Sequence, residues 1–146
     1  EKEIYPAKYN KPHSFNAVLS YMVDKKYSVG LTCVFGSGNT YTPIEAKTYQ
    51  TGVGKYGSLA QPYNSLGNRY GVRNSSQYPN YFRLDLSLSK KTTLFGMNGT
   101  LKFQFINLTN YYNVLLYNWN HKSSPSKVTA YSMFPLIFTF GWDFEF

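Results

Sequence analysis

The chain has 146 residues and a formal net charge of +8, and aromatic residues make up 19% of it. The mean hydropathy is −0.39, and no run approaches the roughly 18 apolar residues of a membrane-spanning helix. The basic residues are scattered rather than gathered in a stripe, which argues against nucleic acid as a partner. The chain opens Glu-Lys-Glu without an apolar segment behind it, so we expect that a signal was removed or that Glu1 is not the true N-terminus.

Two alternating runs follow a polar segment at the start. Residues 14–22 and 27–35 alternate between apolar and polar side chains, which is the period of a β-strand. The polar stretch 24–26 is short enough for a tight turn, so we predict a hairpin. The alternation then disappears from 36 to 79, a segment rich in Gly, Ser, Asn and Tyr. This length is too great for a passive connection, so we predict a functional or mobile loop.

The sequence pattern of the second half of the chain predicts three more strands. Residues 81–89 alternate cleanly, with Arg83 and Asp85 on the polar face. After a short turn at 92–98, we predict a strand over 100–117 with a bulge or bend at 107–110, where the phase is lost. A polar loop follows at 118–131.

The last strand, predicted over 133–146, carries the longest alternation. From residue 136 to the end, the even positions are all large and apolar, while the odd positions become polar and acidic. A strand with lipid on one side and water on the other has this pattern.

The five predicted strands are joined by connections that alternate between short and long. We therefore predict an all-β, antiparallel transmembrane β-barrel segment, with loops 36–79 and 118–131 extracellular and the C-terminus periplasmic. The only adjacent cationic pairs, Lys25–Lys26 and Lys90–Lys91, stand at the ends of alternating runs, where we expect them to anchor the protein at an interface.

Five short motifs follow one another along the chain. They are Lys11-Pro12-His13, the Gly-Ser-Gly-x-x-Tyr-Thr-Pro stretch at 36–43, Tyr81-x-Arg83-Leu84-Asp85, Asn107-Leu108-Thr109-Asn110 and the aromatic terminus. These motifs and their order resemble those of TonB-dependent outer-membrane receptors of nutrient uptake.

The resemblance implies a barrel of about 22 strands around a plug domain. It also implies active import of a scarce nutrient (a siderophore, vitamin, oligosaccharide or peptide) powered by the TonB complex. The sequence lacks the plug and the TonB box, so we expect about the last five strands of such a barrel, as a fragment or a piece of a larger polypeptide. The alternative is a non-transporting outer-membrane barrel with a structural or adhesive role, which would lack an upstream TonB box.

The terminal aromatic residues have two compatible interpretations. They are lipid-facing anchors, and by the resemblance they also form the signal that the barrel assembly machinery recognises, carried by Phe140, Trp142, Phe144 and Phe146. Arg83 and Asp85 are expected to face the lumen, either on a transport path or packed against the plug.

The tyrosine-rich loop resembles recognition loops, in which rigid aromatic rings supply contact area and small polar residues adapt. We predict that it faces outward with the second loop and contacts substrate or a surface lipoprotein; the alternative is a structural lid. The candidate residues are Tyr49, Tyr56, Tyr63, Tyr70, Trp119 and His121.

No catalytic constellation is evident, so we do not expect an enzyme. His13 and His121 lack companions at ligand spacing, and we expect neither a metal nor a cofactor. The expected partners are outer-membrane lipid and lipopolysaccharide, the rest of the barrel with its plug, the TonB complex through the missing N-terminal part, the assembly machinery and a surface lipoprotein.

Overall fold

The computed structural model describes residues 4–52, 63–120 and 127–144. Over these ranges the chain forms only strands, turns and irregular segments, and the pairing is antiparallel, which confirms the predicted all-β antiparallel class. None of the described segments is a helix long and apolar enough to cross a membrane. The chain divides into a sheet unit (Lys11–Gly38, Pro79–Leu116 and Ala130–Phe146) and a second unit (Glu1–Asn10, Asn39–Tyr78 and Tyr117–Thr129).

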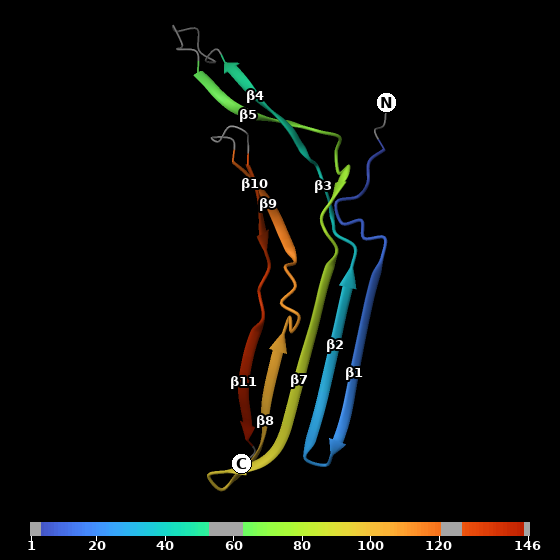
Figure 1. The fold of residues 1–146 in the computed structure, drawn as a ribbon, viewed down its shortest axis with the longest axis vertical. Coiled ribbons are helices and arrows are strands. Elements are labelled where there is room, and N and C mark those ends of the chain that lie inside the picture. Colours follow the sequence, from blue (N-terminus) through green and yellow to red (C-terminus); the bar gives the residue numbers. More distant parts are fainter. Residues whose placement is uncertain (1–3, 53–62, 121–126, 145–146) are drawn as a thin grey trace. The chain divides into compact units, whose positions relative to one another are not determined.

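The sheet unit is built on a five-stranded antiparallel sheet with strand order β1-β2-β7-β8-β11 (Figure 1). Its strands are β1 (Ser14–Asp24), β2 (Tyr27–Gly36), β7 (Tyr81–Leu94), β8 (Met97–Ile106) and β11 (Ile137–Phe144). These strands correspond to the five alternating runs, and β7 is 14 residues long.

Two tight turns join the hairpins of this sheet. Lys25 and Lys26 connect β1 to β2, and Phe95 and Gly96 connect β7 to β8. Phe95 and Gly96 have φ angles of 51° and 79°, the left-handed pair that a two-residue hairpin with primed geometry requires. The predicted turn at 92–98 is therefore too wide, because Leu94 already pairs with Met97.

The predicted strand over 100–117 is wrong as one element. β8 ends at Ile106, and the chain resumes as β9 (Val114–Asn120), which pairs with β10 (Lys127–Ser132) rather than with the five-stranded sheet. The predicted loop 118–131 is thus partly strand. β11 also begins later than the predicted residue 133, two residues after Pro135, which has no N–H to donate to a ladder.

The predicted loop 36–79 holds two small sheets. β4 (Ile44–Gly52) pairs with β5 (Tyr63–Tyr70), and β3 (Thr40–Tyr41) pairs with β6 (Ser76–Gln77). The sequences of β4 and β5 carry polar residues at both odd and even positions, so they lack the alternation on which our strand predictions depend.

Among the described residues, no hydrophobic side chain is buried. The buried residues with polar side chains are Ser37, Thr40, Asn107 and Asn113. The five-stranded sheet is therefore a single layer without a hydrophobic core, held by backbone pairing and by side chains that meet across neighbouring strands.

Two glycines near the β8–β11 ladder provide a matched test of this packing. A Cβ on Gly99 would lie 2.5 Å from the carbonyl oxygen of Asp143 and would collide with the Trp142 indole, whereas a Cβ on Gly141 meets nothing within 4 Å. We expect Gly99→Ala to destabilise the sheet by about 1–3 kcal/mol. We expect Gly141→Ala to be neutral or stabilising by less than about 1 kcal/mol. Urea unfolding followed by tryptophan fluorescence measures both, and equal midpoints for the two variants would contradict the pairing of Gly99 with β11.

Candidate functional site

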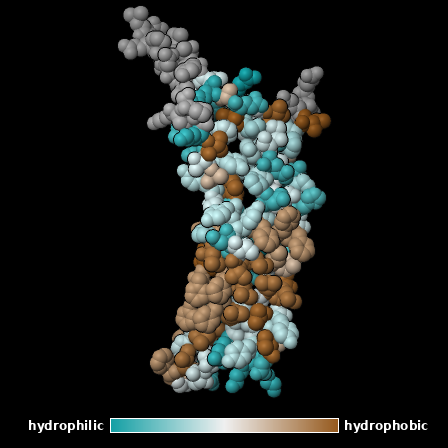
Figure 2. All heavy atoms as spheres, in the orientation of Figure 1, coloured by the Kyte–Doolittle hydropathy of each residue, from teal (hydrophilic) through white to brown (hydrophobic). Residues whose placement is uncertain are grey.

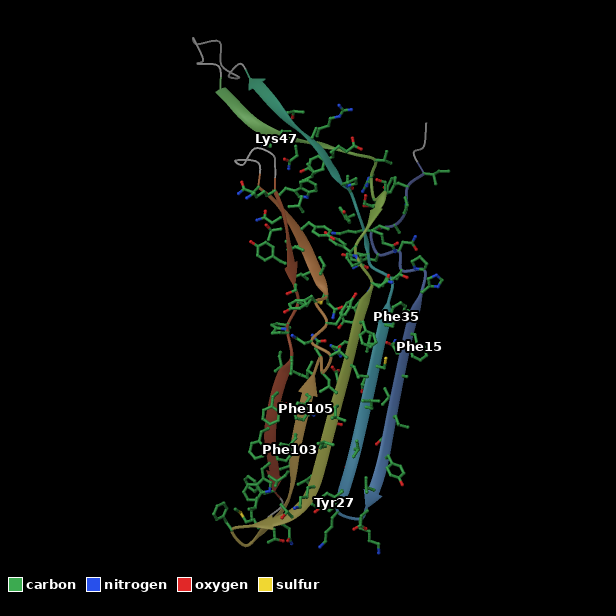
Figure 3. All side chains as sticks on the ribbon, viewed as in Figure 1. Phe15, Tyr27, Phe35, Lys47, Phe103 and Phe105 are labelled. Atoms are coloured by element: carbon green, nitrogen blue, oxygen red, sulfur yellow. The ribbon has the colours of Figure 1, made fainter. Side chains whose placement is uncertain are left out.

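One face of the five-stranded sheet is almost wholly apolar. Because the register is unbroken through the central rows, apolar side chains from all five strands line up across the sheet. Two rows are complete: Leu19, Leu31, Leu86, Phe105 and Phe138; and Tyr21, Val29, Leu88, Phe103 and Phe140. Figure 2 shows hydrophobic residues gathered over this sheet, and Figure 3 labels Phe15, Phe35, Phe103 and Phe105 on it.

This apolar face is exposed rather than packed. Leu19 is 64% exposed, Phe140 is 60% exposed and Phe15 is 57% exposed. Burying one such side chain contributes about 1.5–3 kcal/mol. Contiguous apolar patches of this kind mark surfaces that contact a membrane or another protein.

Aromatic rings concentrate where β8 and β11 meet. The Phe103 ring centroid lies 5.2 Å from that of Phe140, and the Phe105 centroid lies 5.1 Å from that of Phe138. Of the predicted assembly signal, Phe140, Trp142 and Phe144 alternate along this same strand, whereas Phe146 lies outside the described residues.

Next to the two apolar rows, towards the tight turns, the register aligns Tyr27, Lys90, Leu101 and Trp142. The ammonium of Lys90 lies 5.4 Å from the centre of the Tyr27 ring. Tyr, Trp and Lys combine an apolar body with a polar tip, so this row is suited to a boundary between an apolar medium and water.

The opposite face of the sheet is polar. The Ser87 hydroxyl donates to the Gly30 carbonyl over 3.3 Å, and Lys102 forms an ion pair with Asp143. Arg83 and Asp85 lie on this face, as their parity predicts, with Arg83 Nε 3.0 Å from Asp85 Oδ2. The Arg83 Nε–H has no hydrogen-bond partner, so this contact is an ion pair without a hydrogen bond from Nε.

Asp85 has a further partner that the sequence did not reveal. Its Oδ1 accepts the backbone N–H of Asn107 at 2.9 Å, so Asp85 fixes the point at which β8 ends. This contact gives the carboxylate a structural role on the polar face. A role of Arg83 and Asp85 in a transport path stays a prediction.

Asn107 organises the break after β8. It is 2% exposed, has φ of +58°, and its side-chain NH2 donates to the carbonyls of Tyr111 and Phe134, each at 3.1 Å. Its Oδ1 accepts the Tyr111 N–H at 3.1 Å. One buried amide thus closes the turn and ties it to the segment that leads into β11.

Asn113 takes the place of a neighbouring strand. Its Oδ1 accepts the Phe82 N–H and its Nδ2 donates to the Phe82 carbonyl, both at 2.8 Å. Nearer to β8, the N–H of Leu108 donates to the carbonyl of Leu84 at 2.7 Å. The edge of β7 therefore stays hydrogen-bonded after β8 has left it, as buried backbone groups require. The sequence indicated a bend here, but not these amide contacts.

The candidate binding residues of the two loops do not all lie in loops. Tyr56 and His121 lie outside the described residues, Tyr49 and Tyr63 lie in the paired strands β4 and β5, and Tyr70 is 61% exposed. Trp119 lies in β9 and is half-buried. Contact of these residues with a substrate or a lipoprotein stays a prediction.

A tyrosine cluster in the second unit was not predicted. The ring centroids of Tyr41 and Tyr78 are 4.5 Å apart, and those of Tyr78 and Tyr117 are 5.2 Å apart. Burial raises the pKa of Tyr41, with smaller contributions from Tyr117 and Tyr78, while a hydrogen bond with Ser76 opposes the rise. Tyr117 lies 39 positions after Tyr78 and in a different segment of the chain. A periodic pattern in the sequence therefore could not predict that the three rings meet.

No cluster of three or more His, Cys, Asp or Glu that could hold a metal ion occurs in the part of the chain that the structure describes. Comparison with known proteins finds no matching family model, no similar curated protein and no similar solved structure. The functional argument therefore depends on the two faces of the sheet and on its ends.

The asparagine contacts lead to a stability prediction. Asn113→Ala would leave the Phe82 N–H and carbonyl unpaired, and Asn107→Ala would free two carbonyls and one N–H, so we expect each to cost about 1–3 kcal/mol. The exposed Asn16 on β1 provides the control, because Asn16→Ala removes no such bond. Hydrogen exchange at Phe82 should rise in Asn113→Ala alone, and unchanged protection there would contradict the role given to Asn113.

Proposed function

We propose that residues 1–146 form the barrel-closing, C-terminal part of a TonB-dependent receptor in the bacterial outer membrane, which imports a scarce nutrient. In this proposal the apolar face contacts lipid and the polar face lines the lumen. The observation that carries the proposal is an exposed apolar face across all five strands of a sheet in which no described hydrophobic side chain is buried. Lipid tails would cover such a face without a second protein layer.

The strand lengths favour a membrane over a soluble sandwich. β1, β2 and β8 contain 11, 10 and 10 residues. A tilted strand needs about 9–11 residues to cross a bilayer, whereas strands of soluble proteins are most often about 5–6 residues long. The boundary row of Tyr27, Lys90 and Trp142 supports the same assignment, since aromatic girdles flank the apolar band of such barrels.

The connections give the proposed orientation. The tight turns Lys25–Lys26 and Phe95–Gly96 lie at the end of the sheet where β11 also ends. Outer-membrane barrels have short turns on the periplasmic side, so the end of β11 would be periplasmic. The connections that contain β3–β6 and β9–β10 would then be extracellular, where their tyrosines would contact the nutrient or a surface lipoprotein.

The free edges of β1 and β11 support the need for more strands. Each pairs with one neighbour in the described sheet, and single-chain barrels start at about eight strands. The remaining strands and a plug would complete the receptor, and the TonB complex would act through that plug. The aromatic residues of β11 would present the strand to the assembly machinery.

Neighbouring residues on β11 test the lipid-facing assignment. Phe138 and Thr139 are both exposed but lie on opposite faces. Phe138 belongs to the central apolar row, and an Arg near the middle of the lipid face costs about 2–4 kcal/mol, whereas lumen positions tolerate it. We expect Phe138→Arg to abolish the heat-modifiable folded form in outer-membrane fractions and Thr139→Arg to leave it near the wild-type level. If both variants assemble equally well, the apolar face does not contact lipid.

Transport itself is tested genetically. Deleting the gene should abolish growth on one member of a panel of siderophores, vitamins, oligosaccharides and peptides supplied at limiting concentration. Removing TonB from the same host should give the same loss. Growth that depends on neither gene would instead favour the non-transporting, adhesive alternative.

A loop deletion tests whether the β4–β5 hairpin contacts the ligand. A variant in which a short Gly-Ser turn replaces residues 46–69 keeps the backbone hydrogen bond from Gly71 to Pro43. If this variant assembles but loses uptake, the hairpin contacts the ligand.

A further inference from the structure

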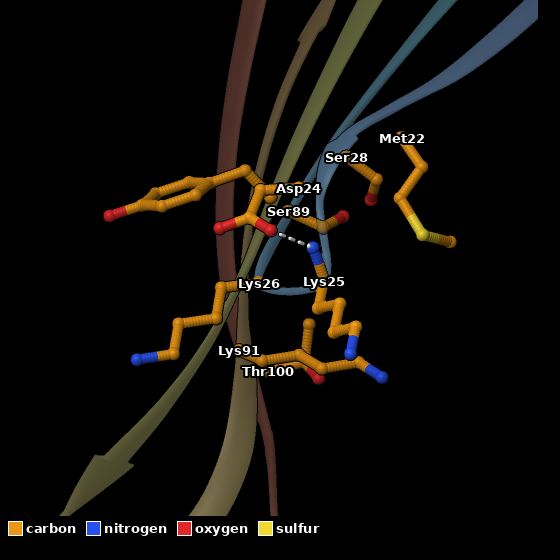
Figure 4. Close-up of a pocket in the computed structure, with 9 residues that line it drawn as sticks. Met22, Asp24, Lys25, Lys26, Ser28, Ser89, Lys91 and Thr100 are labelled. Atoms are coloured by element: carbon orange, nitrogen blue, oxygen red, sulfur yellow. Dashed lines mark hydrogen bonds between the residues drawn. The ribbon is translucent and has the colours of Figure 1, made fainter.

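The turn end of the sheet carries a depression of about 60 Å³ beside the β1–β2 turn, drawn in Figure 4. Most of the residues that line it belong to the polar face, because the register places them in the two polar rows nearest the turns. Figure 4 shows Lys25 extending from the turn to the same side as Lys91. We call this group the polar-face lysine site; its residues are Met22, Lys25, Ser28, Ser89, Lys91 and Thr100.

The four lysines at this end of the sheet divide between its two faces. The N–H of Lys91 donates to the carbonyl of Lys26 at 2.8 Å, which holds the β1–β2 turn against β7. The side chain of Lys26 extends to the side opposite Lys25 and Lys91 in Figure 4, and Lys90 has the parity of the apolar rows. Lys25 and Lys91 therefore form a pair on the polar face, although they lie far apart in sequence.

The polar-face lysine site keeps a net positive charge. Within the described ranges, neither Lys25 nor Lys91 forms an ion pair, and both are exposed. The nearby Lys102 and Asp143 neutralise each other. Asp24 supplies the one carboxylate of the lining, and it accepts the backbone N–H of Lys25 at 2.6 Å.

Hydroxyl groups add neutral donors between the two ammonium groups. Ser28, Ser89 and Thr100 are half-buried and line the depression. Ammonium and hydroxyl donors together suit the oxygens of a carboxylate or a phosphate. One water needs about 10–15 Å³ of such space, so the depression holds a few water-sized positions, which suits a single oxyanion group.

The surface beside the site is hydrophilic. The next polar row towards the middle of the sheet carries hydroxyl and amide groups and no apolar side chain; its members are Ser20, Gly30, Ser87, Gln104 and Thr139. A molecule whose oxyanion lies at the lysines would extend over these groups. The fitting ligand is therefore a small hydrophilic anion.

We infer that the polar-face lysine site binds the carboxylate or phosphate group of a small hydrophilic anion, and that this anion is the imported nutrient. In the proposed receptor the polar face lines the lumen and the tight turns are periplasmic, so the nutrient would reach the site as it leaves the barrel. The binding of an oxyanion depends only on the register of the sheet. The assignment to the nutrient rests on the proposed function.

The binding test uses the full-length protein purified in a neutral detergent and titrated calorimetrically with citrate, inorganic phosphate and the neutral sugar maltotriose. We expect citrate and phosphate to bind and maltotriose not to bind at this site. Lys25→Gln with Lys91→Gln should weaken citrate binding about 10-fold, at about 3-fold for each exposed ion pair lost. Lys25→Arg with Lys91→Arg should retain it.

The opposite face provides the matched control. Lys26→Gln with Lys90→Gln removes the same charge from the same turns, but on the apolar side, and should leave citrate binding near the wild-type level. The heat-modifiable form verifies that each variant assembles. If citrate does not bind the wild-type protein, or if the two glutamine pairs weaken its binding equally, the inference is wrong.

The growth panel tests the assignment to the nutrient. We expect the nutrient found there to carry a carboxylate or phosphate group. Lys25→Gln with Lys91→Gln should raise the nutrient concentration for half-maximal growth about 10-fold, and Lys26→Gln with Lys90→Gln should not. A neutral nutrient, or equal growth of the two glutamine pairs, would overturn the assignment and leave a site for free anions such as phosphate. Those results leave the proposed function standing, whereas growth that depends on neither this gene nor TonB contradicts the proposed function itself.

Discussion

Backbone pairing in one register is the constraint on which the five-stranded sheet depends. With no buried hydrophobic side chain among the described residues, tertiary packing does not hold the strands in place. Side chains alternate with period two, so a slip of one residue in any strand would move its leucines and phenylalanines to the polar face. The row from Leu19 to Phe138 shows that no such slip occurs between the outer strands.

The same constraint explains the buried asparagines. β8 leaves the sheet at Ile106, while β7 continues beyond that point and would otherwise expose unpaired backbone groups. The Asn113 amide presents a donor and an acceptor to Phe82 in the manner of a strand, and Asn107 joins the turn to the segment before β11. A side-chain amide is suited to this substitution because it carries the same two groups as a peptide bond. The break is thus compatible with a continuous hydrogen-bonded edge.

Sequence patterns predicted those parts of the fold in which one face is apolar. The alternation over 14–22, 27–35 and 81–89 identified β1, β2 and β7, because the two faces of each strand differ in polarity. It missed β4 and β5, whose sequences are polar at both parities. It predicted the turn that contains Phe95 but made it too wide, since a phenylalanine in left-handed conformation is an uncommon choice that propensity does not favour. The contacts of Asn107 with Phe134 and of Asn113 with Phe82 join residues 27 and 31 positions apart, which local patterns do not encode.

The parity of Lys90 places it at the end of the apolar face. Along β7 the apolar positions run from Phe82 to Leu88, and the next position on that face is a lysine whose ammonium lies over Tyr27. At about 3.4 Å per residue, the distance from Phe82 to Lys90 is about 27 Å along the strand. A tilt of about 40° reduces this to about 20 Å of depth, close to the roughly 25 Å apolar band of outer-membrane barrels. In a soluble sandwich a lysine on the core face would be costly to bury without a partner. In the proposed membrane location, Lys90 would lie at the edge of the lipid layer, at the depth where phosphate groups begin. The period that defines the apolar rows also positions the first cation beyond them.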